Sequence, residues 1–155
     1  MNIETPEAMT QLGATIAGEL RAGDLVLLNG ELGAGKTTLT RGIGEALGVR
    51  GAVTSPTFVL ARTHPREGAP LVHVDAYRLA SAMELDDIDI DYAASIVVVE
   101  WGAGLLDGVA DSWLTVDIAR AHGGDAEAEV EPREVTVTGH GSRWQRMEWL
   151  DAARD

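Results

Sequence analysis

The stretch LVLLNGELGAGKTTLTRG, residues 25–42, contains Lys36, the only lysine in a chain of 155 residues. The stretch begins with a continuous apolar run up to Gly30, as expected for a strand that is covered on both faces. The glycines that follow predict a loop, and the residues after Lys36 predict a helix that ends at Gly48. A buried strand, a glycine-rich loop and a helix in this order indicate an α/β fold with a mainly parallel sheet.

The same residues match the phosphate-binding pattern G-x-x-x-x-G-K-[ST], the Walker A motif or P-loop. Its glycines let backbone N–H groups converge on phosphate oxygens, and the N-terminus of the helix adds its positive dipole. Lys36 would neutralise the β- and γ-phosphates, Thr37 would place its hydroxyl on Mg²⁺, and Thr38 would donate to the α-phosphate. The expected ATP-binding residues are Gly30, Gly33, Ala34, Gly35, Lys36, Thr37 and Thr38. The alternative is a glycine-rich turn that merely precedes a helix.

Two more apolar runs, LVHVDAYRL and SIVVVEWG, end in the carboxylates of Asp75 and Glu100. Open α/β sheets bind ligands at the carboxyl ends of their strands. Glu100, which follows IVVV, is the better candidate for the Walker B carboxylate, which acts through Mg²⁺ or by orienting the attacking water. Asp75 would then be a second metal-shell or switch residue. For each, the alternative is a strand end that faces solvent. His73 shares a strand face with Asp75, yet it is interpreted as a packed histidine without a catalytic role.

Two further segments have a functional and a plain interpretation. TSPTF (residues 54–58) lies where P-loop proteins often have a loop that senses the γ-phosphate, and hydrolysis would relax it and change the affinity for a partner. An ordinary proline turn that leads into a strand is the alternative. The acidic MELDDIDIDY (residues 83–92) could contact a basic partner or could be a solvated helix or loop face.

The remaining elements follow from capping and alternation. Thr5 as an N-cap and Pro6 at the first helical position predict a helix that stops at Gly23. SWLTVDIAR (residues 112–120) and EVTVTG (residues 134–139) alternate apolar with polar residues. They are interpreted as half-exposed, antiparallel edge strands.

Together these elements predict a single P-loop NTPase domain over residues 1–155, a three-layer α/β/α fold with a mainly parallel sheet and antiparallel edge strands. Its core would span about residues 5–138, the length of a typical single domain. A C-terminal helix is expected over about residues 142–154, where apolar side chains such as Trp144 and Leu150 share one helical stripe.

Composition limits the functions that remain. With 12 basic and 25 acidic residues the net charge is −13, which argues against a broad footprint for DNA or RNA, since phosphate contacts need clustered Lys and Arg. Any RNA involved would be held by a partner. The chain has no cysteine, no basic leader followed by an apolar run, and no apolar run near the roughly 20 residues of a membrane span. We therefore expect a soluble, cytoplasmic protein.

Several classes of P-loop protein can be compared with the sequence. A GTPase that recognises guanine through N-K-x-D needs a second lysine, and an ABC-type ATPase needs a longer chain with a signature such as LSGGQ. A small-molecule kinase remains an alternative, although RTHPREGAP and Arg120 are its only weak lid candidates. A nucleotide-binding regulatory module without catalysis is a further alternative.

The succession of GELGAGKTTLTRG, SPTF, HVDAYRL and VVVEWG resembles the TsaE (YjeE) family over about residues 5–138. The resemblance implies a small bacterial ATPase that is needed to make N6-threonylcarbamoyladenosine (t6A) in tRNA. It also implies partners: TsaD, which carries out the carbamoyl transfer, and TsaB. The chain would hydrolyse Mg²⁺-bound ATP to ADP to sustain turnover and would reach tRNA only through the complex. Hydrolysis by the chain alone should be slow, because no arginine finger is evident.

The resemblance also implies roles for individual residues. The P-loop of the family falls on residues 33–38, the metal-site glutamate on Glu100 with Trp101 beside it, and the functional aspartate on Asp75. An arginine before the last strand, expected near the nucleotide, would match Arg133.

The chain departs from the family pattern at Gly102, Val74 and Thr63. None of these three residues is an expected ligand, so the chemistry is unaffected, whereas details of the partner-facing surface stay open.

Overall fold

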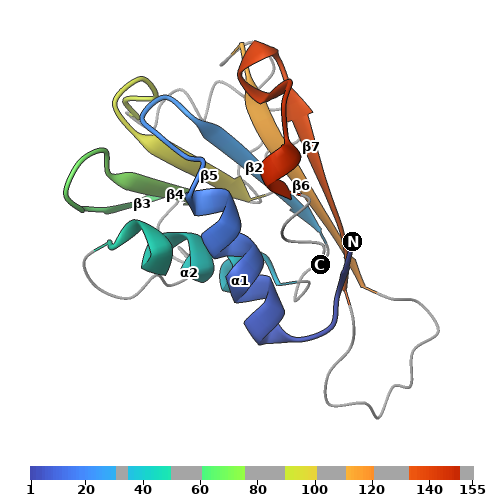
Figure 1. Ribbon diagram of the computed structural model, residues 1–155. Helices are drawn as coiled ribbons and strands as arrows, with labels where there is room; N and C mark the ends of the chain where they lie inside the picture. The colour runs from blue at the N-terminus through green and yellow to red at the C-terminus, as the bar shows by residue number, and fades with distance from the viewer. Residues whose placement is uncertain (31–34, 50–60, 76–89, 101–110, 121–132, 151–155) are drawn as a thin grey trace.

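Within the part of the chain that the structure describes, seven strands form one mixed sheet in the order β1-β7-β6-β2-β5-β4-β3 (Figure 1). The computed structural model describes residues 1–30, 35–49, 61–75, 90–100, 111–120 and 133–150. Its elements are β1 (Asn2–Ile3), α1 (Pro6–Ala17), β2 (Leu25–Gly30), α2 (Lys36–Leu47), β3 (Ala61–His64), β4 (Leu71–Asp75), β5 (Ile96–Glu100), β6 (Trp113–Arg120), β7 (Arg133–His140) and the 3₁₀ turn η2 (Ser142–Trp144).

The four central strands, β6, β2, β5 and β4, run parallel, and β1, β7 and β3 are antiparallel to their neighbours. The predicted combination of parallel and antiparallel strands in one sheet is therefore confirmed, with three of the six strand pairings parallel. The edge positions predicted for β6 and β7 are wrong, because β6 lies between β7 and β2 and pairs parallel with β2, and β7 lies between β6 and β1. The apolar side chains of β6, Leu114, Val116 and Ile118, are buried on one face of the sheet, and the residues between them are partly or fully exposed on the other. Such alternation shows that one face of a strand is buried, but it does not show whether the strand lies inside the sheet or at its edge.

Helix α1 begins where its capping residue predicts, and helix α2 is terminated by the predicted glycine. In α1 the Oγ1 of Thr5 accepts the backbone N–H of Ala8 at 3.0 Å, but the helix ends at Ala17, before the predicted stop. Helix α2 ends at Leu47 and is capped by Gly48. The φ of Gly48 is 74°, in the left-handed region that glycine commonly adopts at helix ends. Each helix has 12 residues, and neither has the length and apolar character needed to cross a bilayer.

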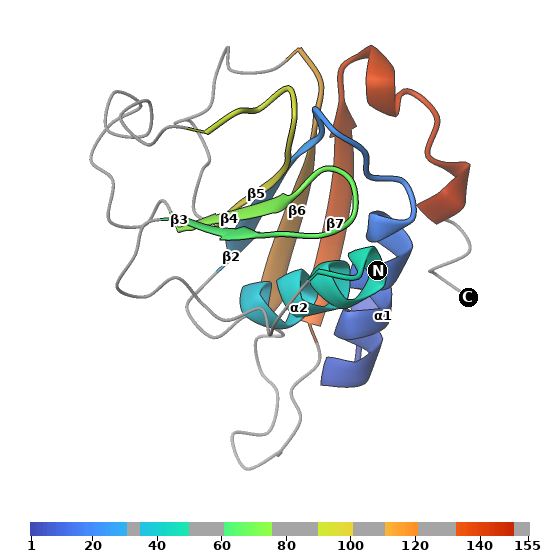
Figure 2. The same ribbon diagram turned by 90° about the vertical axis from the view of Figure 1, so that its left-hand side faces the viewer.

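Both α-helices cover the same face of the sheet, as Figures 1 and 2 show from two directions. Val26, Leu28 and Val98 point to that side and form one core with Leu12 and Leu39 of the helices. A second apolar cluster, on the opposite face, consists of Leu25, Leu27, Val72, Val74, Val97 and Val99. No α-helix among the described residues covers that face, so the three-layer arrangement stays a prediction.

The helices approach each other most closely at two glycines, Gly13 of α1 and Gly42 of α2. A Cβ added to Gly42 would lie 2.3 Å from the carbonyl oxygen of Thr10, and one added to Gly13 would lie 2.5 Å from that of Leu39. Both obstacles are backbone atoms, which cannot rotate away. The crossing therefore requires glycine at both positions, and it holds α2, which begins with Lys36, against α1.

We expect Gly42→Ala to lower the free energy of unfolding by about 1–3 kcal/mol, the usual cost of overpacking. The loss should exceed the gain in helix propensity of about 1 kcal/mol that alanine brings. Urea denaturation followed by circular dichroism measures the change. The control is Gly18→Ala, because a Cβ there meets Thr15 at an ordinary 3.4 Å. If Gly42→Ala unfolds at the same urea concentration as the wild type, the close crossing is incorrect.

The predicted C-terminal helix over 142–154 is wrong in its first part. The turn η2 is followed by non-helical residues, and helical geometry resumes only at Glu148. The apolar side chains of Trp144 and Leu150 are nevertheless buried in the core that contains the helices. A Cβ on Gly139 would lie 2.7 Å from the Trp144 carbonyl oxygen, so the chain turns back too tightly over β7 for one regular helix. The chain beyond Leu150 lies outside the described residues.

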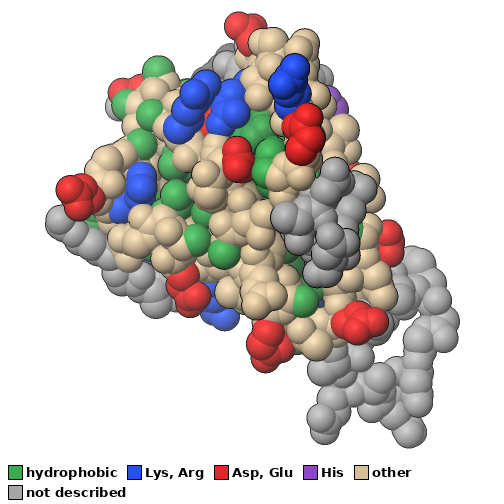
Figure 3. All heavy atoms as spheres, viewed as in Figure 1, with side chains coloured by type: hydrophobic (Ala, Val, Ile, Leu, Met, Phe, Trp, Pro, Cys, Tyr) green, Lys and Arg blue, Asp and Glu red, His purple; other side chains and the backbone are tan. Residues whose placement is uncertain are grey.

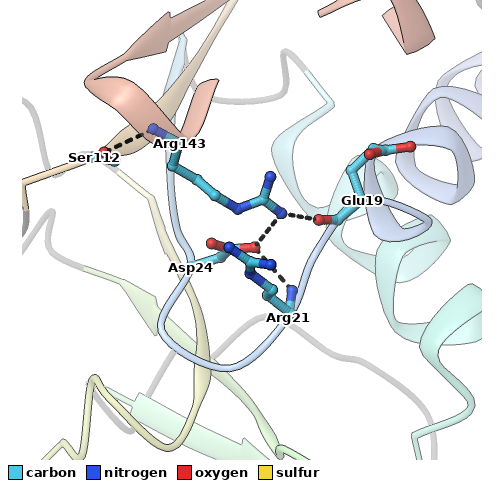
Figure 4. A network of polar contacts seen from close by, with 5 residues as sticks. All are labelled: Glu19, Arg21, Asp24, Ser112 and Arg143. Atoms are coloured by element: carbon cyan, nitrogen blue, oxygen red, sulfur yellow. Dashed lines mark hydrogen bonds and ion pairs between the residues drawn. The ribbon is translucent and has the colours of Figure 1, made fainter. Parts of the chain in front are cut away.

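Arg143 fastens this C-terminal turn to the body of the domain (Figure 4). Its guanidinium donates to the backbone oxygen of Glu19, just beyond α1, and to the carboxylate of Asp24 at 3.2 Å, just before β2. Its backbone N–H donates to Ser112 at 3.3 Å, and the guanidinium lies 4.2 Å from the centre of the Trp144 ring. Since Asp24 is buried, loss of the Arg143 guanidinium would leave its charge without this partner in a place where water does not readily replace it.

Candidate nucleotide-phosphate site

The candidate phosphate loop joins the end of β2 to the start of α2. Gly30 is the last residue of β2 and Lys36 is the first of α2. Gly35 immediately precedes the helix with a φ of 117°, a conformation that other residues rarely adopt, and no side chain caps the first turn. The N-terminal N–H groups of α2 therefore have no side-chain acceptor at the cap position, as an anion-binding helix start requires. Gly33 and Ala34 lie outside the described residues.

Lys36 is buried, and its side chain reaches back to the end of β2. Its exposed fraction is 5%, and its ammonium donates to the backbone oxygen of Gly30 at 2.8 Å. Burial lowers the pKa of this ammonium below its ordinary value, while the negative charges of Glu100 and Asp75 raise the pKa and offset part of that effect. Lys36, Glu100 and Asp75, the three residues that we expect to act in catalysis, thus interact electrostatically. Thr37 and Thr38 follow in the first turn of α2 and are partly buried.

Asp75 and Glu100 lie side by side at the carboxyl end of the sheet. They are the last residues of β4 and β5, and their Cα positions are partners in the parallel ladder. Because paired residues in a parallel ladder point to the same face, both carboxylates lie on the face that carries the helices. Glu100 is also the partner of Leu28, two residues before Gly30, so the phosphate loop and Glu100 come from adjacent strands. Both carboxylates thus end buried strands, as the sequence predicts, and their roles at the site stay predictions.

His73 is the residue that sequence analysis set aside. Its side chain is fully buried, and its Nε2 lies 2.8 Å from Oε2 of Glu100. The contact joins β4 to β5 diagonally, because the ladder partner of Glu100 is Asp75 and that of His73 is Val98. The sequence does place His73 on the same face as Asp75. The sequence does not show which strand is the neighbour of β4. Only the pairing of β4 with β5 brings His73 next to Glu100.

Arg133 is the first residue of β7 and pairs with Arg120 of β6. Arg120 ends β6, which runs parallel to β2. The start of β7 therefore lies at the carboxyl end of these parallel strands, where the phosphate loop also begins, and β7 is two strands away from β2. A role of Arg133 near a nucleotide is compatible with that position and stays a prediction. The segment 54–58 and Trp101 lie outside the described residues.

The described residues contain no group of three or more His, Cys, Asp or Glu side chains that could enclose a metal ion. Mg²⁺ in nucleotide sites is commonly held by one or two protein oxygens together with phosphates and waters, and therefore needs no such group. A hydroxyl at the start of α2 and a buried carboxylate at the end of the adjacent strand are oxygen donors of the kind that Mg²⁺ prefers. Thr37 and Glu100 fit that description.

Comparison with known proteins shows similarity to one family in sequence and to a solved structure in fold. The family model "Threonylcarbamoyl adenosine biosynthesis protein TsaE" matches residues 3–129. A Streptomyces coelicolor relative, "tRNA threonylcarbamoyladenosine biosynthesis protein TsaE", is 58% identical over 88% of this chain and 93% of its own. A Bacillus subtilis relative of the same name is 35% identical over 95% and 87%. The crystal structure of Bacillus subtilis YdiB superposes with a TM-score of 0.75 at 28% identity, covering 99% of this chain and 92% of that one.

Proposed function

The chain belongs to the TsaE family of threonylcarbamoyl adenosine biosynthesis proteins, and we propose that it binds and hydrolyses Mg²⁺-bound ATP to support t6A formation in tRNA. The observation that carries this proposal is the position of Lys36. Its buried ammonium donates to the backbone oxygen of Gly30, at the end of β2, and interacts with both strand-end carboxylates. A lone lysine in this position matches the chemistry of a polyphosphate site.

The residues of the chain have separate tasks in this proposal. The N–H groups after Gly35 would bind phosphate oxygens, and Lys36 would neutralise the charge on the β- and γ-phosphates. The negative charge of the phosphates would raise the pKa of Lys36, which keeps the ammonium charged despite its burial. Glu100 would hold the metal ion or orient the attacking water, with Asp75 beside it as a second metal-shell or switch residue.

Thr37 and Glu100 are the residues that would hold Mg²⁺. The ion supplies positive charge that stabilises the transferred phosphoryl group and the leaving ADP. Both residues are fixed by the ends of regular elements, α2 and β5, which keep their donor oxygens in place.

We propose that the chain acts in the cytoplasm with TsaD- and TsaB-like partners and contacts tRNA only through them. The net charge of −13 supports this division of tasks. On the helix-bearing face in Figure 3, the basic side chains near the top are interspersed with acidic ones. Such a mixed surface attracts a polyanion weakly, since the acidic groups cancel the local field.

Reconstitution tests the proposal. Unmodified tRNA, a threonylcarbamoyl donor, TsaD, TsaB and ATP are combined with and without the chain, and t6A is quantified by mass spectrometry. We expect repeated rounds of modification only when the chain is present, and a single round or none when a non-hydrolysable ATP analogue replaces ATP. Radioactive γ-phosphate should appear as free phosphate. Its appearance on a small metabolite would instead identify a kinase, and t6A yields that are independent of the chain would contradict the proposal.

A further inference from the structure

The contact between His73 and Glu100 restricts the hydrogen-bonding state of both groups. An ionised Glu100 can only accept hydrogen bonds, so at 2.8 Å the Nε2 of His73 must be the donor. The Nδ1 atom of His73 is buried and has no hydrogen-bond partner among the described residues. A bare ring nitrogen tolerates this better than an N–H group would, because a lost donor cannot be compensated in the core. The arrangement therefore favours a hydrogen on Nε2, directed at Glu100.

The sheet fixes this donor with little freedom. His73 pairs with Val98, and Glu100 lies two residues further along β5, so the two side chains meet diagonally on one face. Diagonal neighbours in a sheet are about 7–8 Å apart at their Cα atoms, which only long or aromatic side chains can bridge. Both side chains are almost completely shielded from water, with exposed fractions of 0% and 6%. Rotation of the Glu100 carboxylate would break its bond to His73 inside the protein, where water cannot replace it.

We propose that His73 is a positioning residue, whose Nε2–H holds Oε2 of Glu100 so that Oε1 is directed to the metal ion. This inference rests on the proposed function, because it assigns to Glu100 the role of a metal ligand. Hydrogen bonds to a ligating carboxylate orient it and typically change metal affinity by about 10–100-fold. A histidine that only filled the core would leave the affinity for metal unchanged once the variant is folded.

The test uses three substitutions of His73 in the full chain. The amide nitrogen of Gln reaches about as far as Nε2 of histidine, whereas that of Asn corresponds to Nδ1 and stops short of Glu100. His73→Gln should therefore retain the bond, and His73→Asn should lose it although it is also polar. His73→Phe keeps a ring in the core and removes the donor. Urea denaturation verifies that each variant is folded, and the Gln and Asn pair decides the question if His73→Phe does not fold.

Two affinities are measured for each variant. The first is the affinity for Mn²⁺, a paramagnetic substitute for Mg²⁺, with ADP present, by electron paramagnetic resonance. The second is the affinity for ADP in EDTA. We expect His73→Asn and His73→Phe to bind Mn²⁺ about 10–100-fold more weakly, with ADP affinity in EDTA unchanged, and His73→Gln to restore most of the difference.

Three results would overturn the inference. One is a Mn²⁺ affinity in the Asn and Phe variants equal to that of the wild type. Another is an equal loss of both affinities, which would indicate a purely structural role. In both, the wild type still binds ADP and the proposed function stands. If the wild type itself binds neither ADP nor Mn²⁺ with ADP, the proposed function and this inference fail together.

Discussion

Replacing Lys36 by alanine is expected to abolish t6A formation in the reconstituted system and to lower the rate of ATP hydrolysis by at least about 100-fold, or about 2.7 kcal/mol. The side chain is buried against the carbonyl oxygen of Gly30, so its charge acts where water screens it little. Loss of the ammonium would leave the phosphate charge opposed only by backbone dipoles and by Mg²⁺. Phosphate release at saturating partner concentration measures the rate.

Two further variants make the Lys36 prediction specific. Lys36→Arg keeps the charge, but a planar guanidinium does not replace a compact ammonium at this buried position, so we expect most of the loss to remain. Arg41→Ala removes an exposed positive charge from the same helix and should leave the rate within a factor of about two. Equal effects of Lys36→Ala and Arg41→Ala would show that only the net charge matters, contrary to a phosphate-binding loop.

The second large effect is expected for Glu100→Gln, which should lower the rate of ATP hydrolysis by about 100-fold or more while the protein still binds nucleotide. The substitution keeps the shape and an oxygen that can accept from His73, but removes the negative charge that holds the metal ion or orients water. It also removes a charge that raises the pKa of Lys36, so that pKa should fall further. Single-turnover hydrolysis and nucleotide titration separate the two steps.

A matched control for Glu100→Gln is Asp117→Asn. Asp117 lies on β6, which also borders β2, but it is exposed and hydrogen-bonded to Asn29 at 3.1 Å. Its neighbours Val116 and Ile118 are buried under the helices, so Asp117 points to the opposite face. We expect hydrolysis to be nearly unchanged in this variant. A Glu100→Gln protein that sustains t6A formation at the wild-type rate would instead support a regulatory module without catalysis.

The part of the site that is local in sequence could be predicted, because short spacing fixes its geometry. Gly30, Gly35 and Lys36 lie within seven consecutive residues between a buried strand and a helix, and each lies where that pattern requires. Asp75 and Glu100 were predictable for a related reason. A buried parallel strand that ends in a carboxylate delivers that carboxylate to the ligand-binding edge of the sheet.

Features that depend on which elements are neighbours could not be predicted. The bond between His73 and Glu100 requires β4 and β5 to be adjacent in a given register, and alternation within one strand does not specify its neighbour. The interior positions of β6 and β7 were missed for the same reason. Likewise, Gly13 and Gly42 lower helix propensity locally, and only the crossing of α1 and α2 explains why a side chain is not tolerated there.

Isothermal titration calorimetry tests the central claim most directly, namely that the glycine loop and Lys36 bind the phosphates of a nucleotide. Wild-type chain and Lys36→Ala are titrated with ATP and with ADP in the presence of Mg²⁺, after urea denaturation has shown that both are folded. We predict a saturable heat of association for the wild type that the alanine variant lacks. A wild type that gives no heat beyond that of the variant, with either nucleotide, would contradict the account.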